Sequence, residues 1–470
     1  MAELRKRQRA TSKNAQEPSP DELERRAQVR AARQQKKDTL AATRGQDLVE
    51  NGASKVGAAG IAAPAKTIPA RMMLPVKGHI ISPPSRTAPP LRTLTIMTYN
   101  ILAQCLCRRE LFPYCKKEHL KYKARVPRVL YEITQDLKPD VACLQEVDNF
   151  DEMVKPVLER EGYDWEYLRK VKEKENGHGL CIIWKKSIFY KHASQSLFYD
   201  TSPLTHPTTL TPLTNNIAQL LALKLHRPAG GVGGILLSNT HLFWKPFFRY
   251  ERSRQGWVLM DAVERFRREL VGAGGKWPGF VCGDFNTLPN DGLYRALTKQ
   301  PLTVQQIADL EPLTTSSPPP ANPAPVSPPS PTSPPSDPTP SQILTNLSHL
   351  PTLHSAYSTY RAIHPTHPGY SPVLSPDAAN TADHASAQVE WDEPPYTNYA
   401  AWKGTLDYIF LVGEGGGGAE EGAGGEGIGE TRVEVESVLE IPPPALLEPG
   451  LPNDHFGSDH VALMAKVTLY

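Results

Sequence analysis

An aspartate and an asparagine follow a short apolar run in the second half of the chain. The run, residues 279–282, stops at Gly283 and is followed by Asp284 and Asn286. An apolar run of this length that is bounded by glycine predicts a buried strand, whose end places both side chains on a short loop. Gly283 suits the position because a backbone that turns sharply, or is approached closely, favours a residue without a Cβ atom.

The same design recurs along the chain, because other apolar runs also adjoin polar side chains that could do chemistry. These further candidates are Asn100, Glu146, His241, Asp407, Asp459 and His460. Asp407 differs from the others because it lies early within its own apolar run, residues 406–411. Strands fix the loop residues at their ends rigidly, so sites in layered folds gather there. If these strand ends share one edge, their carboxylates, amides and histidines meet in one place.

Such a set of side chains suits a metal-assisted reaction at phosphorus. Oxygen ligands with little sulfur are typical of a hard cation such as Mg²⁺ or Mn²⁺, which also binds phosphate oxygens. A further carboxylate can activate a water molecule, while an amide and a histidine stabilise charge on the phosphoryl oxygens. A buried aspartate beside a histidine fixes the tautomer of the imidazole and favours its protonated form. The residue types therefore predict hydrolysis of a phosphoester.

Hydrophobic periodicity predicts the elements that position these groups. Apolar positions at helical spacing predict helices over residues 122–137 and 252–270. Strands are predicted at residues 94–99, 141–144, 180–184, 217–225, 235–237, 279–284, 406–411 and 461–469. Strands and helices are mixed and the strands outnumber the helices, so we expect two packed sheets covered by helices in one domain.

Three segments have compositions that cannot bury a core. Residues 1–90 are predicted to be a disordered basic tail, because they have few large apolar side chains. A Pro/Ser-rich segment at residues 314–341 and a Gly/Glu-rich segment at residues 413–429 are predicted to be disordered insertions. The hydrophobic fraction of only 39% and the 46 prolines agree with this division, which leaves one catalytic domain at residues 91–470.

Basic side chains cluster in the tail, at residues 5–9 and 30–37, although the formal net charge of the chain is only +2. A solvated tail is the simplest structural interpretation, and attraction to phosphate backbones or a nuclear address stays open as a functional one. The six cysteines are scattered and predict a reducing compartment. No apolar run approaches the length of a membrane span, so we expect an intracellular protein of the nucleus, nucleolus or cytoplasm without a membrane partner.

Three smaller groups of side chains keep an alternative open. The first group is a possible zinc site, although its spacing matches no common zinc module, and consists of Cys105, Cys107, Cys115 and His119. Basic side chains that either line a phosphate-binding groove or begin an exposed helix are Arg249, Arg252 and Arg254. Aromatic side chains that either pack in the core, as we favour, or stack on bases are Phe243, Trp244, Phe247 and Phe248.

Six motifs in one order carry a resemblance to a known family. They are Thr98-Tyr99-Asn100, Leu144-Gln145-Glu146, Asn239-Thr240-His241-Leu242, Gly283-Asp284-Phe285-Asn286, Leu406-Asp407-Tyr408-Ile409 and Ser458-Asp459-His460. The set closely resembles the endonuclease/exonuclease/phosphatase superfamily, and within it the deadenylase-related branch of nocturnin and the fungal Ngl-type RNA exonucleases. The resemblance spans about residues 94–470 without the insertions, and six motifs in order make a chance match improbable.

The resemblance implies a fold, a cofactor and a set of metal ligands. The implied fold is a four-layer α-β-β-α sandwich, with two packed mixed sheets flanked by helices, and the implied activity is Mg²⁺-dependent phosphodiester cleavage. It further implies that Glu146 is the principal metal ligand and that Asn100 and Asp459 support the metal site. Asp284 would be either the general base or a ligand of a second metal.

The remaining roles are also implied by the resemblance. Asn286 would hold the attacking water or a phosphoryl oxygen, and Asn216 matches a position that contacts phosphate. His241 and His460 would stabilise the pentacoordinate phosphorus, with Asp407 orienting His460. Relatives often have Asp-Gly where this chain has His178-Gly179, so the role of that loop stays open.

Three functions follow as hypotheses. The first is an RNA exonuclease that works on single-stranded 3′ ends, in poly(A) tails or in precursors of structural RNAs. The second is a phosphatase that acts on a nucleotide cofactor, a phosphoinositide or another small phosphorylated molecule, the lipid being disfavoured because no amphipathic membrane segment is present. The third is a non-catalytic RNA-binding or scaffold protein with a decayed site. It predicts losses among the acidic ligands, and this sequence shows none.

Overall fold

The described residues of the computed structural model all belong to one compact unit, residues 63–470. They are residues 64, 68–76, 90–170, 177–202, 204, 213–229, 232–272, 276–312, 337–370, 391–413 and 433–470. The segments predicted to be disordered, residues 1–90, 314–341 and 413–429, therefore lie largely outside the described residues.

Within the described residues, one sheet has seven strands in the order β1-β14-β15-β2-β3-β5-β4. Their bounds are β1 (Met73–Pro75), β14 (Val433–Leu439), β15 (Leu463–Leu469), β2 (Arg92–Asn100), β3 (Val141–Val147), β5 (Gly179–Lys185) and β4 (Tyr163–Arg169). β2 and β3 pair in parallel, and the other neighbours pair antiparallel.

A second sheet has six strands in the described part of the chain, in the order β10-β13-β9-β8-β7-β6. Their bounds are β10 (Leu353–Ser355), β13 (Asp407–Val412), β9 (Gly279–Asp284), β8 (Val232–His241), β7 (Ile217–Ala229) and β6 (Phe189–Phe198). β8 and β9 pair in parallel and the other neighbours antiparallel. Two short strands, β11 (Asn398–Tyr399) and β12 (Lys403–Gly404), form a separate hairpin.

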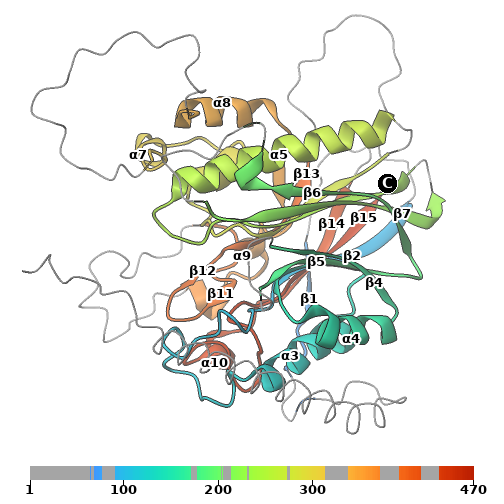
Figure 1. The fold of residues 1–470 in the computed structure, drawn as a ribbon, viewed down its shortest axis with the longest axis vertical. Coiled ribbons are helices and arrows are strands. Elements are labelled where there is room, and N and C mark those ends of the chain that lie inside the picture. Colours follow the sequence, from blue (N-terminus) through green and yellow to red (C-terminus); the bar gives the residue numbers. More distant parts are fainter. Residues whose placement is uncertain are drawn as a thin grey trace, which may run out of the picture. The chain divides into compact units, whose positions relative to one another are not determined.

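Helices cover the outer faces of both sheets (Figure 1). The six-stranded sheet is covered by α5 (Arg249–Gly272) and α8 (Pro340–His349), and the seven-stranded sheet by α3 (Tyr122–Tyr131) and α4 (Lys155–Arg160). The short helix α6 (Gly292–Leu297) packs with α5 and α8 in the same apolar cluster. The other helical segments are η1 (Glu132–Leu137), η2 (Phe150–Val154), η3 (Tyr199–Thr201), α7 (Val304–Ala308), α9 (Tyr360–Ile363), η4 (Pro368–Tyr370) and α10 (Pro444–Leu447). The predicted four-layer α-β-β-α sandwich is confirmed.

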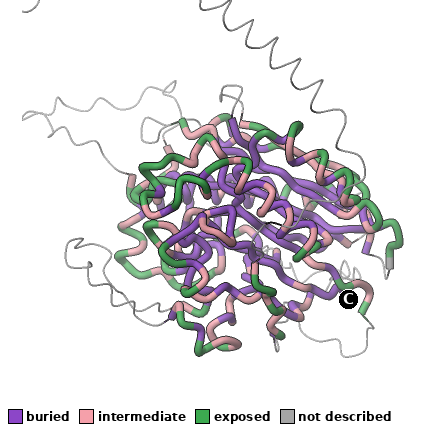
Figure 2. The backbone as a smooth tube through the Cα atoms, turned by 90° about the horizontal axis from the view of Figure 1, so that it is seen from below, coloured by how far each residue is buried: buried purple, intermediate pink, exposed green. Residues whose placement is uncertain are grey.

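Apolar runs form the strands because their two faces are both buried. In β8, Ile235 and Leu237 pack against the other sheet, whereas Leu236 packs under the α5 layer. β9 repeats the alternation with Phe280 facing the other sheet and Val281 facing α5. Side chains alternate between faces along a strand. A strand with helices on one face and a sheet on the other therefore has apolar side chains at consecutive positions. Figure 2 shows the buried segments concentrated in these central layers.

Two buried amides join the sheets beneath the strand ends. The side-chain Nδ2 of Asn239 on β8 donates to the carbonyl of Leu144 on β3 at 3.0 Å, and the Asn239 Oδ1 accepts from the Nε2 of Gln145 at 2.8 Å. Asn239 and Gln145 are fully buried. Because the Asn239 amide finds partners on β3 for both its donor and its acceptor, this pairing fixes how β3 lies across β8.

Residues 71–75 of the N-terminal tail are ordered, which corrects the prediction of disorder over residues 1–90. β1 pairs with β14, and Arg71 beside it donates to the carbonyls of Ala462 at 2.6 Å and Glu440 at 2.7 Å. Arg71 also lies 3.4 Å from the buried carboxylate of Glu132. A three-residue edge strand is held by backbone hydrogen bonds, which composition does not reveal.

Two predicted boundaries also differ from the structure. The Pro/Ser-rich segment predicted over residues 314–341 ends earlier, because Thr339 caps α8, which begins at Pro340. The helix predicted over residues 122–137 changes after Tyr131 into the π-helical stretch η1. Strands β4, β6 and β14 were not predicted, because charged and polar residues interrupt them and they lack a continuous apolar run.

The substitution Asn239→Ala is expected to lower the free energy of unfolding by about 2–4 kcal/mol, because it leaves buried groups of β3 without hydrogen-bond partners. Urea unfolding measures the change. Asn290→Ala, which alters an exposed asparagine, is the control and is expected to change stability by less than about 0.5 kcal/mol. A similarly small change for Asn239→Ala would contradict the role given to the inter-sheet amides.

Candidate active site

The strand directions bring the predicted site residues to one edge of the sandwich. Asn100 pairs with Gln145 in the parallel pair β2–β3, and His241 pairs with Asp284 in the parallel pair β8–β9. β13 runs antiparallel to β9, so its first residue, Asp407, is the register partner of Asp284. This explains why Asp407 lies at the beginning of its strand while the others lie at strand ends.

The loop before β15 reaches the same edge because β15 runs antiparallel to β2. The Ser458 hydroxyl donates to the carbonyl of Asn100 at 2.6 Å and accepts from the backbone N–H of His460 at 3.2 Å. His460 is buried, whereas Asp459 is half-buried, with its Oδ1 3.4 Å from the Ser458 hydroxyl. Ser458 thus ties the loop that carries Asp459 and His460 to the end of β2.

Asn100 bridges two buried carboxylates. Its Nδ2 lies 3.3 Å from Oε1 of Glu146 and 3.0 Å from Oδ2 of Asp284, while its Oδ1 accepts from the backbone N–H of Leu102 at 3.1 Å. The other oxygen of Glu146 accepts from the backbone N–H of Ala103 at 2.9 Å. Burial, with a contribution from Asp459, raises the pKa of Glu146. Burial and then Asp407 raise the pKa of Asp284 to about 7.

Asp407 and His460 form an oriented, charged pair. The Nδ1 of His460 lies 2.7 Å from Oδ2 of Asp407. Burial lowers the pKa of His460, but Asp407 outweighs burial and the net pKa lies well above its usual value. The imidazole is therefore protonated near neutral pH, and its Nε2, 3.8 Å from Oδ2 of Asp284, donates into the site.

Thr397 holds this pair in place and was not identified from the sequence. Its hydroxyl accepts from the backbone N–H groups of Leu406 at 2.9 Å and Asp407 at 3.1 Å, and donates to Oδ2 of Asp407 at 2.6 Å. Because both acceptor positions of the hydroxyl are used, its one hydrogen is directed at the carboxylate. Thr397 lies in an irregular segment before β11, where no periodic pattern points to it.

His241 lies between the two carboxylates in the opposite protonation state. Its Nε2 is 3.6 Å from Oδ2 of Asp284 and its Nδ1 is 4.0 Å from Oε1 of Glu146. Burial, then Lys170 and the neighbouring histidines, lower the pKa of His241 well below its usual value. The two candidate histidines therefore differ, since His241 is neutral and His460 is cationic.

His178 is part of the same neighbourhood. Its ring centre lies 6.5 Å from that of His241, and the side chain is buried. Burial and the charge of Lys170 lower the pKa of His178 to about 3, so its ring is neutral. The structure thus places the loop whose role was left open beside the site.

The two further asparagines position backbone groups at this edge. Asn286 donates through Nδ2 to the carbonyl of Leu242 at 3.0 Å, and its backbone N–H donates to Oδ1 of Asp284 at 2.9 Å. Asn216 donates through Nδ2 to the carbonyl of His241 at 2.6 Å. Both side chains therefore lie at the site, and their predicted contacts with water or phosphate stay predictions.

Unusual backbone conformations accompany the site. Gly283 has φ of 145°, and a Cβ atom there would collide with the carbonyl of Thr240 on the adjacent strand β8. Glu146 and Asn286 have φ of 59° and 48°, in the left-handed region that most residues avoid. Glu146 lies where the β3–β5 register is interrupted, so the strand turns its carboxylate towards Asn100.

The donor set fits a divalent cation. Glu146, Asp284 and Asp407 are buried carboxylates, and the contacts of Glu146 come from an amide, a backbone N–H and a neutral imidazole. Oδ1 of Asp407 is buried without a hydrogen-bond partner among the described residues. One ligand atom each from Asp284, Asp407 and His460 lie within 4.8 Å of one another. Buried negative charge in excess of His460⁺ is the environment that a hard cation neutralises.

The alternative sets do not form comparable sites. In the cysteine set, the Sγ of Cys115 donates to the carbonyl of Pro452 and the Sγ of Cys107 to that of Leu120, so the thiols point at separate backbone groups. Arg254 forms a buried pair with Glu251 at 2.7 Å, and Arg252 is buried against a loop, so neither begins an exposed helix.

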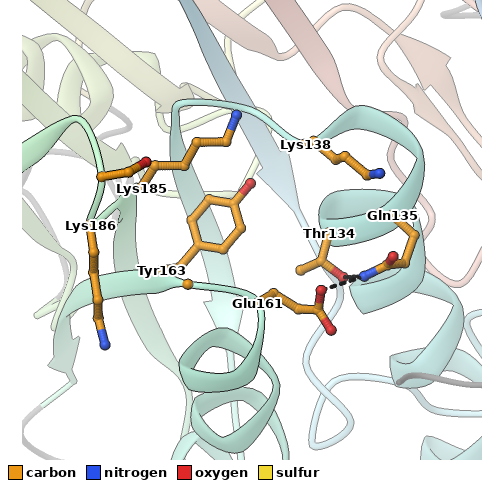
Figure 3. A pocket seen from close by; sticks show the side chains of 9 residues that line it. Thr134, Gln135, Lys138, Glu161, Tyr163, Lys185 and Lys186 are labelled. Atoms are coloured by element: carbon orange, nitrogen blue, oxygen red, sulfur yellow. Dashed lines mark hydrogen bonds between the residues drawn. The ribbon is translucent and has the colours of Figure 1, made fainter. Parts of the chain in front are cut away.

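A basic cavity of about 490 Å³ lies at the opposite end of the strands (Figure 3). Lys138 and Lys185 line it together with Glu161, which accepts from Gln135 at 2.8 Å. Lys185 lies 2.8 Å from the Asp140 carboxylate. β3 begins beside this cavity and carries Glu146 at its far end, so the cavity is separate from the catalytic edge.

Comparison with known proteins places the chain in a family. A family model described as the Endonuclease/Exonuclease/phosphatase family matches residues 97–460. The chain belongs to this family. The matched range contains every candidate site residue from Asn100 to His460, and members of the family depend on a divalent metal.

One relative matches along most of its length, the Probable RNA exonuclease C9B6.11c of Schizosaccharomyces pombe, which is 30% identical over 90% of this chain and 86% of that protein. RNA exonuclease NGL2 of Saccharomyces cerevisiae is 35% identical over 44% of this chain and 42% of its own length. Nocturnin of Rattus norvegicus is 30% identical over 50% of this chain and 52% of its own length. These relatives confirm the resemblance to the deadenylase-related branch.

A solved structure shows the same fold. The crystal structure of ANGEL2, a 2′,3′-cyclic phosphatase, in complex with adenosine-2′,3′-vanadate has a TM-score of 0.55 and 21% identity. The match covers 86% of this chain and 99% of that one. Among the described residues of this chain, no helix has the length and apolar character needed to cross a membrane.

Addition of Mg²⁺ or Mn²⁺ is expected to raise the melting temperature of the wild type, by an amount equivalent to about 2–3 kcal/mol at roughly 100 times the dissociation constant. Glu146→Gln is expected to lose most of this increase, because it removes a buried anionic ligand. Glu161→Gln, at the distant basic cavity, is the control and retains it. Equal metal-induced increases in all three proteins would contradict the assignment of Glu146, and differential scanning fluorimetry measures them.

Without metal, Asp284→Asn is expected to flatten the dependence of stability on pH. The folded-state pKa of Asp284 is about 7, above its ordinary value of 3.8, so its contribution is fully present below the ordinary value and is lost as the pH rises through 7. Between about pH 4.5 and about pH 8 the wild type should therefore lose more stability than the variant, on the order of 1–4 kcal/mol. Urea unfolding in EDTA measures this, with the exposed Glu110→Gln as control. Identical slopes for Asp284→Asn and wild type would contradict the role given to the buried carboxyl.

Proposed function

We propose that this protein is a 3′-to-5′ exoribonuclease that hydrolyses phosphodiester bonds at single-stranded RNA ends with Mg²⁺, or Mn²⁺, as cofactor. One observation carries the proposal. Glu146, Asp284 and His460 meet at one edge of a sandwich whose sequence matches, over 90% of its length, a relative named as a probable RNA exonuclease. Poly(A) tails and the 3′ ends of structural RNA precursors are the proposed substrates.

The residues of the site divide the work of hydrolysis. Asp284, whose pKa of about 7 suits a group that must both accept and release a proton near neutral pH, takes the proton of the attacking water. His460, protonated because of Asp407, donates from Nε2 to a phosphoryl oxygen as charge develops there. His241 is neutral and donates a hydrogen bond to the same group without adding charge.

The remaining groups hold the metal and the substrate. Glu146, supported by Asn100 and Asp459, would bind the divalent cation, which when bound supplies positive charge to the phosphoryl oxygens. Asn286 would hold the attacking water or a phosphoryl oxygen through its side-chain amide, of which one Nδ2 hydrogen is donated to the Leu242 carbonyl. Asn216 sets the position of His241 through the carbonyl of that residue and contacts phosphate from the same side.

The tail and the cysteines suggest where this reaction takes place. We propose residence in the nucleus, the nucleolus or the cytoplasm, with the basic clusters at residues 5–9 and 30–37 favouring the nucleus. All six cysteines are free thiols, which suits a reducing compartment.

Incubation with 5′-labelled oligo(A) and with a mixed-sequence oligonucleotide in Mg²⁺ tests the proposal. The wild type is expected to produce a ladder of products shortened from the 3′ end, and Glu146→Ala to slow it by roughly 10³-fold, because the main cation ligand is lost. Glu161→Ala is the control with full activity. Absence of a ladder with the wild type, or undiminished laddering by Glu146→Ala, would refute the proposal.

The same assay separates the phosphatase alternative. Release of inorganic phosphate from a nucleotide cofactor or another small phosphorylated molecule, without shortening of RNA, would favour that alternative. An oligonucleotide that ends in a 2′,3′-cyclic phosphate is included, because the ANGEL2 structure is described as that of a 2′,3′-cyclic phosphatase. Opening of the cyclic phosphate without shortening of the RNA would indicate that the protein processes RNA ends and is not an exonuclease.

A further inference from the structure

The loop between β8 and α5 exposes two large aromatic side chains beside the catalytic edge. Trp244 and Phe247 are each 64% exposed, whereas Phe243 in the same loop is 6% exposed. This divides the aromatic group that was predicted to pack in the core, because only part of it is buried. Two large aromatic side chains exposed on one loop beside a catalytic edge are candidates for contact with a ligand.

The loop is rigid because a buried arginine holds its backbone. Arg252, 2% exposed, donates to the carbonyls of Lys245 at 2.6 Å, Pro246 at 2.7 Å and Phe243 at 3.4 Å. The side chain of Gln255 accepts from the backbone N–H of Phe243 at 3.0 Å. With the carbonyls turned inwards to Arg252, the loop presents its exposed side chains outwards in a fixed arrangement.

The ends of the loop are also pinned. The rings of Phe243 and Phe248 pack edge to face with their centres 5.3 Å apart, which closes the loop at its base. Between them, the exposed Lys245 places its Nζ 5.4 Å from the ring centre of Phe248. Lys245 thus lies between the two exposed aromatic residues in the sequence.

The loop is also fixed to the catalytic groups. The Leu242 backbone N–H donates to the carbonyl of Asp284 at 2.9 Å, and the Leu242 carbonyl accepts from Asn286 at 3.0 Å. Trp244 is three residues beyond His241, so their Cα atoms are no more than about 11 Å apart. Trp244 therefore lies near the groups that would contact the cleaved phosphate.

We propose that Trp244 and Phe247 form a stacking platform for unpaired nucleobases next to the cleaved bond, with Lys245 contacting the phosphate between them. The platform rests on the proposed function and gives its basis for single-stranded RNA. Aromatic rings stack on any base and a duplex hides its base faces, so such a platform selects unpaired strands with little sequence preference. A protein partner is disfavoured because two side chains on one loop are far smaller than a stable protein interface.

Binding measurements on the full-length chain in EDTA, which prevents cleavage, test the platform. Fluorescence anisotropy compares oligo(A) with an abasic oligonucleotide of the same length. The wild type is expected to bind oligo(A) more tightly than the abasic strand, and Trp244→Ala and Phe247→Ala each to weaken binding of oligo(A) by roughly 5- to 100-fold. Their affinity for the abasic strand should stay at the wild-type value, because no base is there to stack.

Two further variants test whether an aromatic ring at this loop is what binds the base. Trp244→Phe retains a ring and should recover most of the affinity for oligo(A). Tyr190→Ala removes an aromatic side chain that is 45% exposed on β6, at the end of the sheet away from the site, and should bind both strands as the wild type does. Unchanged melting temperatures for the four variants show that the differences concern binding and not folding.

The outcomes separate this inference from the proposed function. A wild type that shortens RNA but binds abasic and base-containing strands equally would overturn the platform alone. The platform is also overturned if Trp244→Ala and Phe247→Ala bind oligo(A) like the wild type, or weaken both strands by the same factor. A wild type that does not shorten RNA at all would refute the proposed function, and with it the basis of the platform.

Discussion

The burial of three carboxylates beside one protonated histidine is the constraint on which the site depends. Glu146, Asp284 and Asp407 are all removed from water, and the protonated His460 places a positive charge beside them. Buried charge is unfavourable unless it is paired and hydrogen-bonded, so the surrounding backbone N–H groups, amides and hydroxyls must be held in fixed positions. The rigidity of the edge therefore follows from its electrostatics, and the same uncompensated charge attracts a cation.

Topology and electrostatics act together in separating the two histidines. His241 ends a strand whose neighbours at the edge are a carboxylate and other imidazoles, and burial keeps it neutral. His460 sits on a loop that the antiparallel strand β15 returns to the same edge, where Asp407 keeps it charged. The two histidines thus differ in protonation state because they lie at different places in the fold and have different neighbours.

Much of this edge could be predicted from the sequence, because an apolar run predicts a buried strand and the polar residue after the run marks the end of that strand. Apolar runs do not predict which strands are neighbours in a sheet. The position of Asp407 opposite Asp284 follows only from the antiparallel register of β13 and β9. The sequence pattern also leaves the burial of a charged side chain open. Arg252 is buried because backbone carbonyls of the preceding loop satisfy its guanidinium, and such partners leave no periodic signal.

The short strand β1 has a consequence for how the chain can be shortened. Arg71, just before it, is the cation that faces the buried Glu132, whose carboxylate also accepts from Tyr99 at 3.0 Å. A chain that started at the first long apolar run would leave Glu132 without that cation and would turn β14 into an open sheet edge able to pair with other molecules. The smallest autonomous form of this domain therefore includes Arg71 and β1, inside a stretch whose composition predicts a disordered tail.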